Sequence, residues 1–267
     1  MTDLGGKKNQ EDLLSRISEQ SARCVVPIFR NVKNGKPEAC GTGFLVSKDD
    51  DVFLITAGHV ISDLEDNHDL FFYINNSTVR HLVGSYRKTL SFDRNHKNDR
   101  MDTGVLKLDG FNAVLNGTSM KSPLPFYLLL PAATPRAAKH YLVTGFPSSK
   151  SRYHFPSRSF VSKPYAFYCI STNSPYVELG LRENLHIALS FDEKDIHAGD
   201  FGSSVNPPSL KGMSGSPVWL LFDEVGSNPS ETHVTGVFIE HWRDKRLLIA
   251  ADICVAIDII QKEFAAS

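Results

Sequence analysis

Residues 210–220 read LKGMSGSPVWL. Four of the five residues over 212–216 are glycine or serine, and an apolar run that predicts a buried strand begins at Pro217. A turn of small residues before such a strand can present the hydroxyl of Ser214. Gly212 can adopt a backbone geometry that turns its N–H and that of Ser214 toward one point, as acyl transfer requires for the developing oxyanion. Alone, this stretch also fits an ordinary turn.

A serine hydroxyl is a weak nucleophile until a base takes its proton and a third group holds that base. Nine of the ten histidines lie in contexts typical of solvated or hydrogen-bonded side chains. His59 differs because it closes the apolar run VFLITAGHVI, where Ala57 and Gly58 leave its imidazole uncrowded. Without Ser214 it would be read as an ordinary strand-end histidine.

The third group should be a carboxylate next to a strand. Asp102 is followed by the apolar strand Val105–Leu108. Asp99 is its rival, but charged neighbours indicate a solvated loop residue. By itself Asp102 also fits a turn residue, since aspartate is common in turns before strands.

The composition is that of a globular chain. Its 267 residues are 41% apolar and carry a formal net charge of −1. No basic stripe stands out, so neither nucleic acid nor a membrane surface is expected as a partner. No apolar run approaches the ~20 residues that a membrane-spanning helix needs.

The N-terminus and the cysteines bear on location. The first 20 residues lack the apolar core of a secretory signal, so we predict a cytoplasmic protein. Cys24, Cys40, Cys169 and Cys254 show no CxxC spacing, and we expect free thiols. The sequence indicates no metal and no cofactor.

Short apolar runs separated by turn residues dominate both halves of the chain and predict an antiparallel β-sandwich or barrel. They cover 24–29, 43–47, 52–57, 70–74, 79–84, 104–108, 140–146, 166–171, 185–191, 216–222, 233–239 and 246–253. The proline-rich stretch 109–138 predicts a linker. A short amphipathic helix is expected at 10–22 and a terminal helix at 255–264.

Three motifs follow one another along the chain: TAGHV (56–60), DTGVLKL (102–108) and GMSGSPVW (212–219). In this order they resemble the three catalytic segments of the trypsin-like (chymotrypsin-fold, S1-type) serine peptidases, specifically an intracellular bacterial-type member. Supporting segments resemble neighbouring strands of that family, namely GTGFLVS (41–47), VTGFP (143–147) and VTGVFIEH (234–241). The resemblance extends over about residues 24–258.

The resemblance implies an all-β fold of two antiparallel six-stranded barrels with the active site between them, a short N-terminal helical extension and a C-terminal helix. The extension would cover 1–23, the first barrel 24–125, and the second barrel with the C-terminal helix 126–267.

The same resemblance implies a serine endopeptidase that acts on protein or peptide substrates through an acyl-enzyme. Ser214 would be the nucleophile, His59 the general base and then acid, and Asp102 the orienting carboxylate. The N–H groups of Gly212 and Ser214 would form the oxyanion hole.

Substrate would bind as an extended strand against Ile239, Glu240 and His241. The pocket for the residue before the cut would be lined near Pro208 and Leu247. Glu240 is the nearest acid, and strand alternation would turn it away if Ile239 or His241 faces in. A small or apolar residue before the scissile bond is therefore expected.

Four features depart from the family pattern. Val60 follows the histidine where secreted members carry a disulfide cysteine. Met213 precedes the serine where members activated by cleavage carry an aspartate. Ser216 replaces a second glycine, and 148–205 is an insertion without a family template.

Two other functions stay open. The chain could be a catalytically silent or latent protease-like binding module, although all three triad positions are present. It could also be an effector protease of an intracellular stress or bacterial immune assembly, with a regulatory protein partner that the sequence does not identify.

Overall fold

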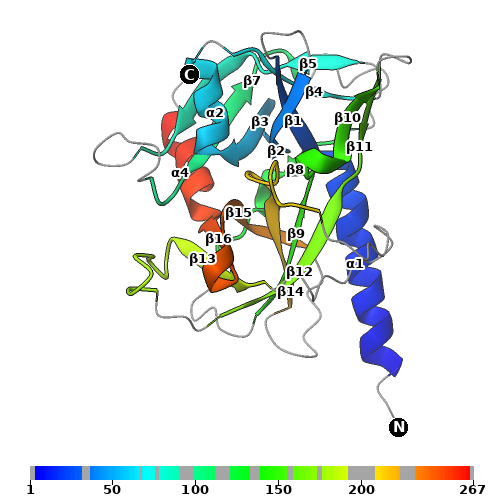
Figure 1. Ribbon diagram of the computed structural model, residues 1–267, viewed down its shortest axis with the longest axis vertical. Coiled ribbons are helices and arrows are strands. Elements are labelled where there is room, and N and C mark those ends of the chain that lie inside the picture. The colour runs from blue at the N-terminus through cyan, green and yellow to red at the C-terminus, as the bar shows by residue number, and fades with distance from the viewer. Residues whose placement is uncertain are drawn as a thin grey trace.

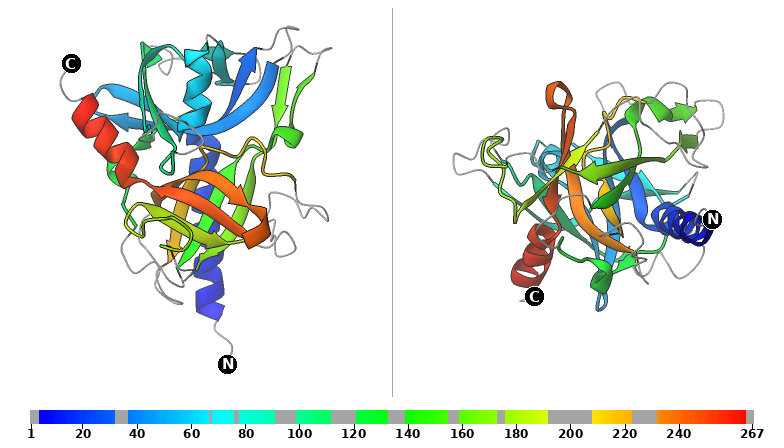
Figure 2. Two further views of the ribbon diagram at one scale, coloured as in Figure 1. Left: turned by 60° about the vertical axis from the view of Figure 1, so that its left-hand side comes forward. Right: turned by 90° about the horizontal axis from the view of Figure 1, so that it is seen from below.

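The computed structural model describes residues 4–31, 37–66, 68–75, 78–90, 99–111, 121–132, 139–154, 159–172, 176–191, 208–222 and 232–264. They form two β halves, with one long helix along the side and a second helix that runs from one half to the other (Figure 1, Figure 2). Where the chain is described, its helices are α1 (Leu4–Cys24), α2 (Gly58–Glu65) and α4 (Cys254–Glu263). Its short 3₁₀ turns are η2 (Phe126–Leu128), η3 (Ser148–Lys150) and η4 (Arg243–Lys245).

The strands follow the predicted apolar runs and add a few short ones. They are β1 (Val25–Asn31), β2 (Pro37–Lys48), β3 (Asp51–Ala57), β4 (Leu70–Tyr73), β5 (Val79–His81), β6 (Gly84–Lys88), β7 (Thr103–Leu108), β8 (Leu124–Pro125), β9 (His140–Gly145), β10 (Ser151–His154), β11 (Ser159–Ser162), β12 (Tyr165–Ser171), β13 (His186–Ser190), β14 (Pro217–Phe222), β15 (His233–Trp242) and β16 (Leu247–Asp252).

The first half is one sheet with the strand order β5-β4-β1-β2-β3-β7-β6, and β8 pairs in parallel with β2. Leu45, Leu54 and Leu106 belong to the apolar core on one side of it. Within the described residues this sheet has eight strands and its path stays open, where the sequence predicted six strands in a closed barrel.

The second half closes into the expected six-stranded antiparallel barrel, in the order β12-β13-β16-β15-β14-β9. Tyr141, Val218 and Phe238 are among its buried core residues. The β15–β16 ladder shifts register between Phe238 and Glu240. Such a bulge sets two residues against one and breaks the alternation of side chains between the two faces.

A third apolar cluster joins the two halves and includes both terminal helices. Leu13 and Ile17 of α1 and Ile260 of α4 are all buried in it. Burying one such side chain stabilises the fold by about 1.5–3 kcal/mol relative to exposure. The α4 helix leaves the closed barrel and reaches the first sheet (Figure 2). There the ring centroids of Phe264 and Phe53 lie 5.5 Å apart.

The predicted helix at 10–22 is present, and it extends from Leu4 to Cys24. Lys121 Nζ donates to the carbonyls of Ala22 and Val25 at 2.9 and 2.8 Å, and these bonds fasten the C-terminal end of α1. Burial lowers the pKa of Lys121 to about 8.

The insertion over 148–205 contributes a hairpin, β10–β11, that reaches the first half (Figure 1). Phe160 packs there against Phe29 and Tyr73, with ring centroids 4.3 and 4.4 Å apart. The inserted segment therefore links the two halves. Parts of it lie outside the described residues: 155–158, 173–175 and 192–205.

Three further predictions meet the structure here. The linker over 109–138 contains β8 and η2. Cys24, Cys40, Cys169 and Cys254 are free thiols, as expected. Burial raises the pKa of the first three to about 12.

None of the described helices is long and apolar enough to cross a membrane. The domain boundaries at 23 and 125 stay predictions.

Candidate active site

Asp102 and His59 meet where α2 begins beside β7. His59 Nδ1 lies 2.6 Å from Asp102 Oδ2, and the backbone N–H of His59 donates to Asp102 Oδ1 at 2.8 Å. The N–H of Gly58 donates to the Asp102 carbonyl at 2.7 Å. One aspartate therefore fixes both the ring and the backbone of His59, and Nε2 is the ring atom left to meet another group.

The helix that carries His59 was not predicted. The apolar run leaves the strand at Ala57, and α2 begins at Gly58. His59 is thus in the first turn of a helix rather than at the end of a strand, and its side chain is 44% exposed.

The loop before Asp102 is tightly bonded. Asp102 has a φ of +30°, which few residues other than glycine adopt, although aspartate tolerates such values. Asp99 accepts hydrogen bonds from Met101 N–H at 3.1 Å and Thr89 Oγ1 at 2.5 Å. Asp99 is only 8% exposed, so its interpretation as a solvated loop residue is wrong.

The second half also holds this loop, through His186. This buried histidine of β13 lies with Nε2 2.9 Å from the Arg100 carbonyl. Its Nδ1 accepts the Arg182 N–H at 3.0 Å. In the sequence His186 is one of the nine histidines in ordinary contexts, because only the fold brings it beside Arg100.

Opposing effects act on the His59 imidazole. Burial lowers its pKa, while the hydrogen bond and the charge of Asp102, with smaller contributions from Asp63 and Glu240, raise it. The net pKa lies above the ordinary value of 6.5. The surrounding carboxylates therefore favour the imidazolium form.

The 212–216 turn is rigid and depends on its glycines. Gly212 and Gly215 have φ values of +88° and +90°. A Cβ on Gly215 would lie 2.0 Å from the Thr42 carbonyl oxygen, so no other residue fits there without displacement. The N–H of Gly215 donates to the Phe238 carbonyl at 2.7 Å, and that of Ser216 to the Met213 carbonyl at 2.9 Å.

The sequence predicted that the N–H groups of Gly212 and Ser214 bind the oxyanion. Among the described residues, neither Gly212 N–H nor Ser214 N–H donates to a protein acceptor. The Lys211 carbonyl accepts the Ser148 N–H at 2.8 Å, which fixes the peptide plane that carries the Gly212 N–H. Within the described chain, both N–H groups are therefore without a protein acceptor.

Ser214 lies against the end of β3 and the strand β15. Its carbonyl accepts the Thr42 N–H at 2.9 Å, and a Cβ on the next residue, Gly215, would come within 2.9 Å of Ala57 N. Ser214 Oγ is 3.5 Å from the Ile239 carbonyl. No hydrogen bond joins Ser214 to His59 in the part of the chain that the structure describes.

A cleft of about 340 Å³ opens beside His59. Its walls come from both halves of the molecule. The residues that line it are His59, Asp99, Arg100, Asp102, Leu181, Ile239, Glu240, Trp242 and Ile249. Arg100 lies over the Trp242 ring at 5.9 Å, a cation–π contact across this cleft.

The predicted substrate-binding residues separate into two groups. Ile239 and Glu240 both line the cleft beside His59. The expectation that Glu240 turns away concerns a different pocket, the one for the residue before the cut, and it stays a prediction. Pro208 is buried and His241 packs edge-on against Phe191 at 5.3 Å, and neither lines this cleft.

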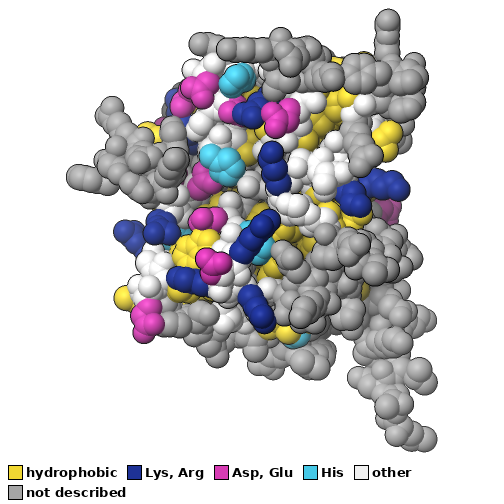
Figure 3. All heavy atoms as spheres, in the orientation of Figure 1, with side chains coloured by type: hydrophobic (Ala, Val, Ile, Leu, Met, Phe, Trp, Pro, Cys, Tyr) yellow, Lys and Arg dark blue, Asp and Glu magenta, His cyan; other side chains and the backbone are white. Residues whose placement is uncertain are grey.

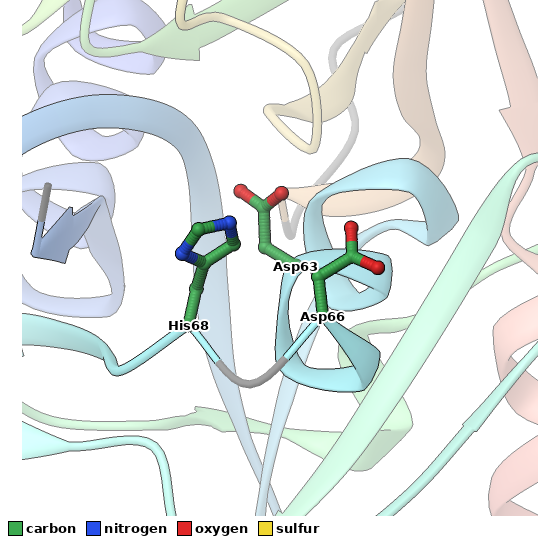
Figure 4. A group of neighbouring side chains, drawn as sticks. All are labelled: Asp63, Asp66 and His68. Carbon is green, nitrogen blue, oxygen red and sulfur yellow. The ribbon is translucent and has the colours of Figure 1, made fainter. Parts of the chain in front are cut away.

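The face shown in Figure 3 carries acidic, basic and histidine side chains interspersed with apolar ones. Near the far end of α2, Asp63, Asp66 and His68 bring one ligand atom each within 4.8 Å of the others (Figure 4). Asp63 is paired with Arg30 at 3.2 Å, and Asp66 and His68 are exposed. We assign no metal to this group.

Comparisons with known proteins agree with this architecture. No family model matches the chain, and neither does any curated protein. Among solved structures, the chain is similar to a protein named HBP, with a TM-score of 0.57 and 15% identity over 93% of this chain and 94% of that one. It is also similar to a Glu endopeptidase solved in complex with MPD, with a TM-score of 0.50 and 13% identity over 90% of each chain. Likeness at these identities shows the fold, and the chain has the chymotrypsin-like two-barrel fold that the sequence predicted.

Proposed function

We propose that this chain is a serine endopeptidase with Ser214 as nucleophile, His59 as general base and acid, and Asp102 as orienting carboxylate. One observation carries the proposal: the Asp102 carboxylate holds both Nδ1 and the backbone N–H of His59, at 2.6 and 2.8 Å. The His59–Asp102 pair lies at the cleft, and the carbonyl of one cleft residue, Ile239, contacts Ser214 Oγ.

The reaction would follow from these contacts. With Nδ1–H bound to Asp102, Nε2 carries the lone pair that accepts the Ser214 proton as Oγ attacks the substrate carbonyl. The N–H groups of Gly212 and Ser214 would stabilise the oxyanion. Asp102 would stabilise the imidazolium, which then protonates the leaving amine. Water would release the acyl group by the same steps in reverse.

The substrate would be an extended peptide that pairs with β15 and fills the cleft beside His59. We retain the preference for a small or apolar residue before the cut. Its support is the apolar character of the predicted pocket segments, where Leu210, Leu247 and Leu248 are all buried. Glu240 supplies a carboxylate on the cleft side, next to His59.

One observation favours the second candidate, a latent or silent protease-like module. Ser214 Oγ points to the Ile239 carbonyl at 3.5 Å, and among the described residues it makes no hydrogen bond to His59. A rotation of the Ser214 side chain would have to precede catalysis. A ligand or a regulatory partner could supply the energy for it.

A fluorophosphonate probe tests the proposal because it reports an activated serine without a known substrate. The full chain is treated with the probe, and the modified residue is located by peptide mass spectrometry. We expect modification at Ser214 and none in Ser214→Ala or His59→Ala. Labelling of Ser214→Ala at the wild-type level would refute the assignment. A folded wild type that never reacts would favour the latent module.

A further inference from the structure

One buried hydroxyl of the first half reaches the 212–216 turn of the second half. Thr42 lies on β2 and is fully buried. Its Oγ1 donates to the Gly212 carbonyl at 2.8 Å, and its backbone N–H donates to the Ser214 carbonyl at 2.9 Å. Thr42 thus bonds to the carbonyls of the two residues whose N–H groups form the proposed oxyanion hole.

The same hydroxyl has a second partner in the second half. Thr42 Oγ1 accepts the Phe146 N–H at 3.0 Å. Phe146 is two residues before Ser148, whose N–H holds the Lys211 carbonyl at 2.8 Å. The peptide units before and after Gly212 are therefore both anchored. The Thr42 hydroxyl anchors the second one directly, and through Phe146 it holds the segment whose Ser148 N–H anchors the first.

This arrangement fixes a backbone that glycine alone would leave loose. Gly212 has a φ of +88°, and without a side chain it has little intrinsic preference for one peptide orientation. Valine at position 42 would fill the same space as threonine, but it would leave the Gly212 carbonyl and the Phe146 N–H buried without their partner. Serine would keep both bonds.

We propose that Thr42 is a positioning residue that orients the oxyanion-binding N–H groups of Gly212 and Ser214 from the opposite half of the molecule. The inference rests on the proposed function of this site. Thr42 does not line the cleft and is not proposed to touch substrate.

The test compares Thr42→Val with Thr42→Ser in the full chain, with Thr235→Val as a matched control. Thr235 is equally buried, and its hydroxyl donates to a carbonyl outside the turn, that of Val218, at 3.3 Å. We expect kcat to fall roughly 10²-fold in Thr42→Val, as displacement of a catalytic group by about 1 Å can cause. The KM should stay near wild type, Thr42→Ser should recover most of the rate, and Thr235→Val should keep it.

A peptide boronic acid gives a second readout, because its boronate mimics the tetrahedral intermediate. Its affinity should fall together with kcat in Thr42→Val. A wild-type kcat in Thr42→Val, or equal losses in Thr42→Val and Thr42→Ser, would overturn the role of the hydroxyl. If Thr42→Val does not fold, Thr42→Ala takes its place against Thr42→Ser.

Results that refute the proposed function differ from results that refute only the role of Thr42. A wild type that neither cleaves peptides nor reacts with fluorophosphonate would remove the function. The amide resonances of Gly212 and Ser214 would then still test Thr42. Shift and broadening of both in Thr42→Val, with recovery in Thr42→Ser, would support it, and unchanged resonances would refute it.

Discussion

The two halves of the candidate site differ in how completely they are assembled. In the first half, His59 and Asp102 meet through two hydrogen bonds of 2.6 and 2.8 Å. In the second half, Ser214 sits in a rigid turn, but its Oγ lies 3.5 Å from the Ile239 carbonyl and makes no described bond to His59. The His59–Asp102 pair is assembled, whereas Ser214 Oγ faces the Ile239 carbonyl.

The difference follows from where each group is anchored. His59 and Asp102 stand at adjoining ends of one sheet and helix, so short loops fix their geometry. Ser214 belongs to the other half, and its approach to His59 depends on contacts between the halves such as that of Thr42 with Ser214.

The largest expected effect comes from removing members of the triad. Ser214→Ala and His59→Ala should each lower kcat by about 10⁴–10⁶-fold, because groups that act as a unit lose most of their effect together. Asp102→Asn should lower it by about 10⁴-fold, since an amide stabilises the wrong tautomer of His59. Peptide hydrolysis under single-turnover conditions measures each loss.

Thermal unfolding is the control for these variants. Ser214→Ala should melt close to wild type, because among the described residues Ser214 Oγ makes a single long hydrogen bond, at 3.5 Å. Asp102→Asn should melt lower, because Asp102 Oδ1 also accepts the His59 N–H. If all three variants lost little activity, and to the same extent, the proposed difference between the assembled His59–Asp102 pair and the separate Ser214 would be contradicted.

The next effect concerns the stability of the turn. Gly215→Ala should lower the free energy of unfolding by about 3 kcal/mol or more, since strain at positive φ adds to overpacking. The new Cβ would lie 2.0 Å from the Thr42 carbonyl oxygen and 2.2 Å from Thr56 Oγ1. Urea denaturation followed by fluorescence measures the loss.

Gly110→Ala is the matched control. Gly110 also has a positive φ, +62°, but a Cβ there meets nothing within 4 Å. It should lose only about 1 kcal/mol, the strain of the left-handed conformation alone. Similar losses at both positions would show that the close approach of β2 to the turn contributes nothing.

The sequence predicted the candidate site from short motifs, and the structure brings two of its members, His59 and Asp102, into contact. The His59, Asp102 and Ser214 segments each carry a local signal, and their order adds specificity. The strands were predictable for the same reason, since alternating or continuous apolar runs are local features. The open path of the first sheet was not, because it depends on pairing between distant strands.

The errors have physical causes that no single segment reveals. The bulge that shifts the β15–β16 register between Phe238 and Glu240 was not predicted, because it depends on pairing with the partner strand. Asp99 looked solvated, yet the fold brings Thr89 to it at 2.5 Å. Thr42 reads as one more strand residue in GTGFLVS, and only contact with the other half gives its hydroxyl a role. All of these features depend on contacts between residues that are separated in the sequence.

A smaller effect concerns pH. The pKa of His59 lies above 6.5, so the acid limb of kcat/KM should have its midpoint above pH 6.5, because only the neutral imidazole accepts the serine proton. The free energy of unfolding changes with pH in the opposite direction. The contribution of His59 to this free energy is fully present below pH 6.5 and is lost as the pH rises through the folded-state pKa.

Glu240→Gln sharpens this prediction, since the Glu240 carboxylate is one of the charges that raise the pKa of His59. The midpoint of the acid limb should move to lower pH in this variant. Glu263→Gln, an exposed acid at the end of α4, should leave it in place. A wild-type midpoint below 6.5 would contradict the raised pKa.

The smallest expected effect tests whether α1 influences catalysis or only stabilises the fold. Ser21 of α1 is buried, with Oγ 3.1 Å from Thr144 Oγ1, which also accepts Trp219 Nε1–H at 2.9 Å. Ser21→Ala should lower the free energy of unfolding by about 0.5–1.5 kcal/mol, the net value of one hydrogen bond. Ser15→Ala, on the exposed side of the same helix, should not lower it. Both variants should keep the wild-type kcat, because Thr42 and Ser148 hold the turn independently of α1. A rise in kcat when Ser21 is replaced would instead show that α1 restrains the nucleophile, and would tie the observed orientation of Ser214 to the N-terminal helix.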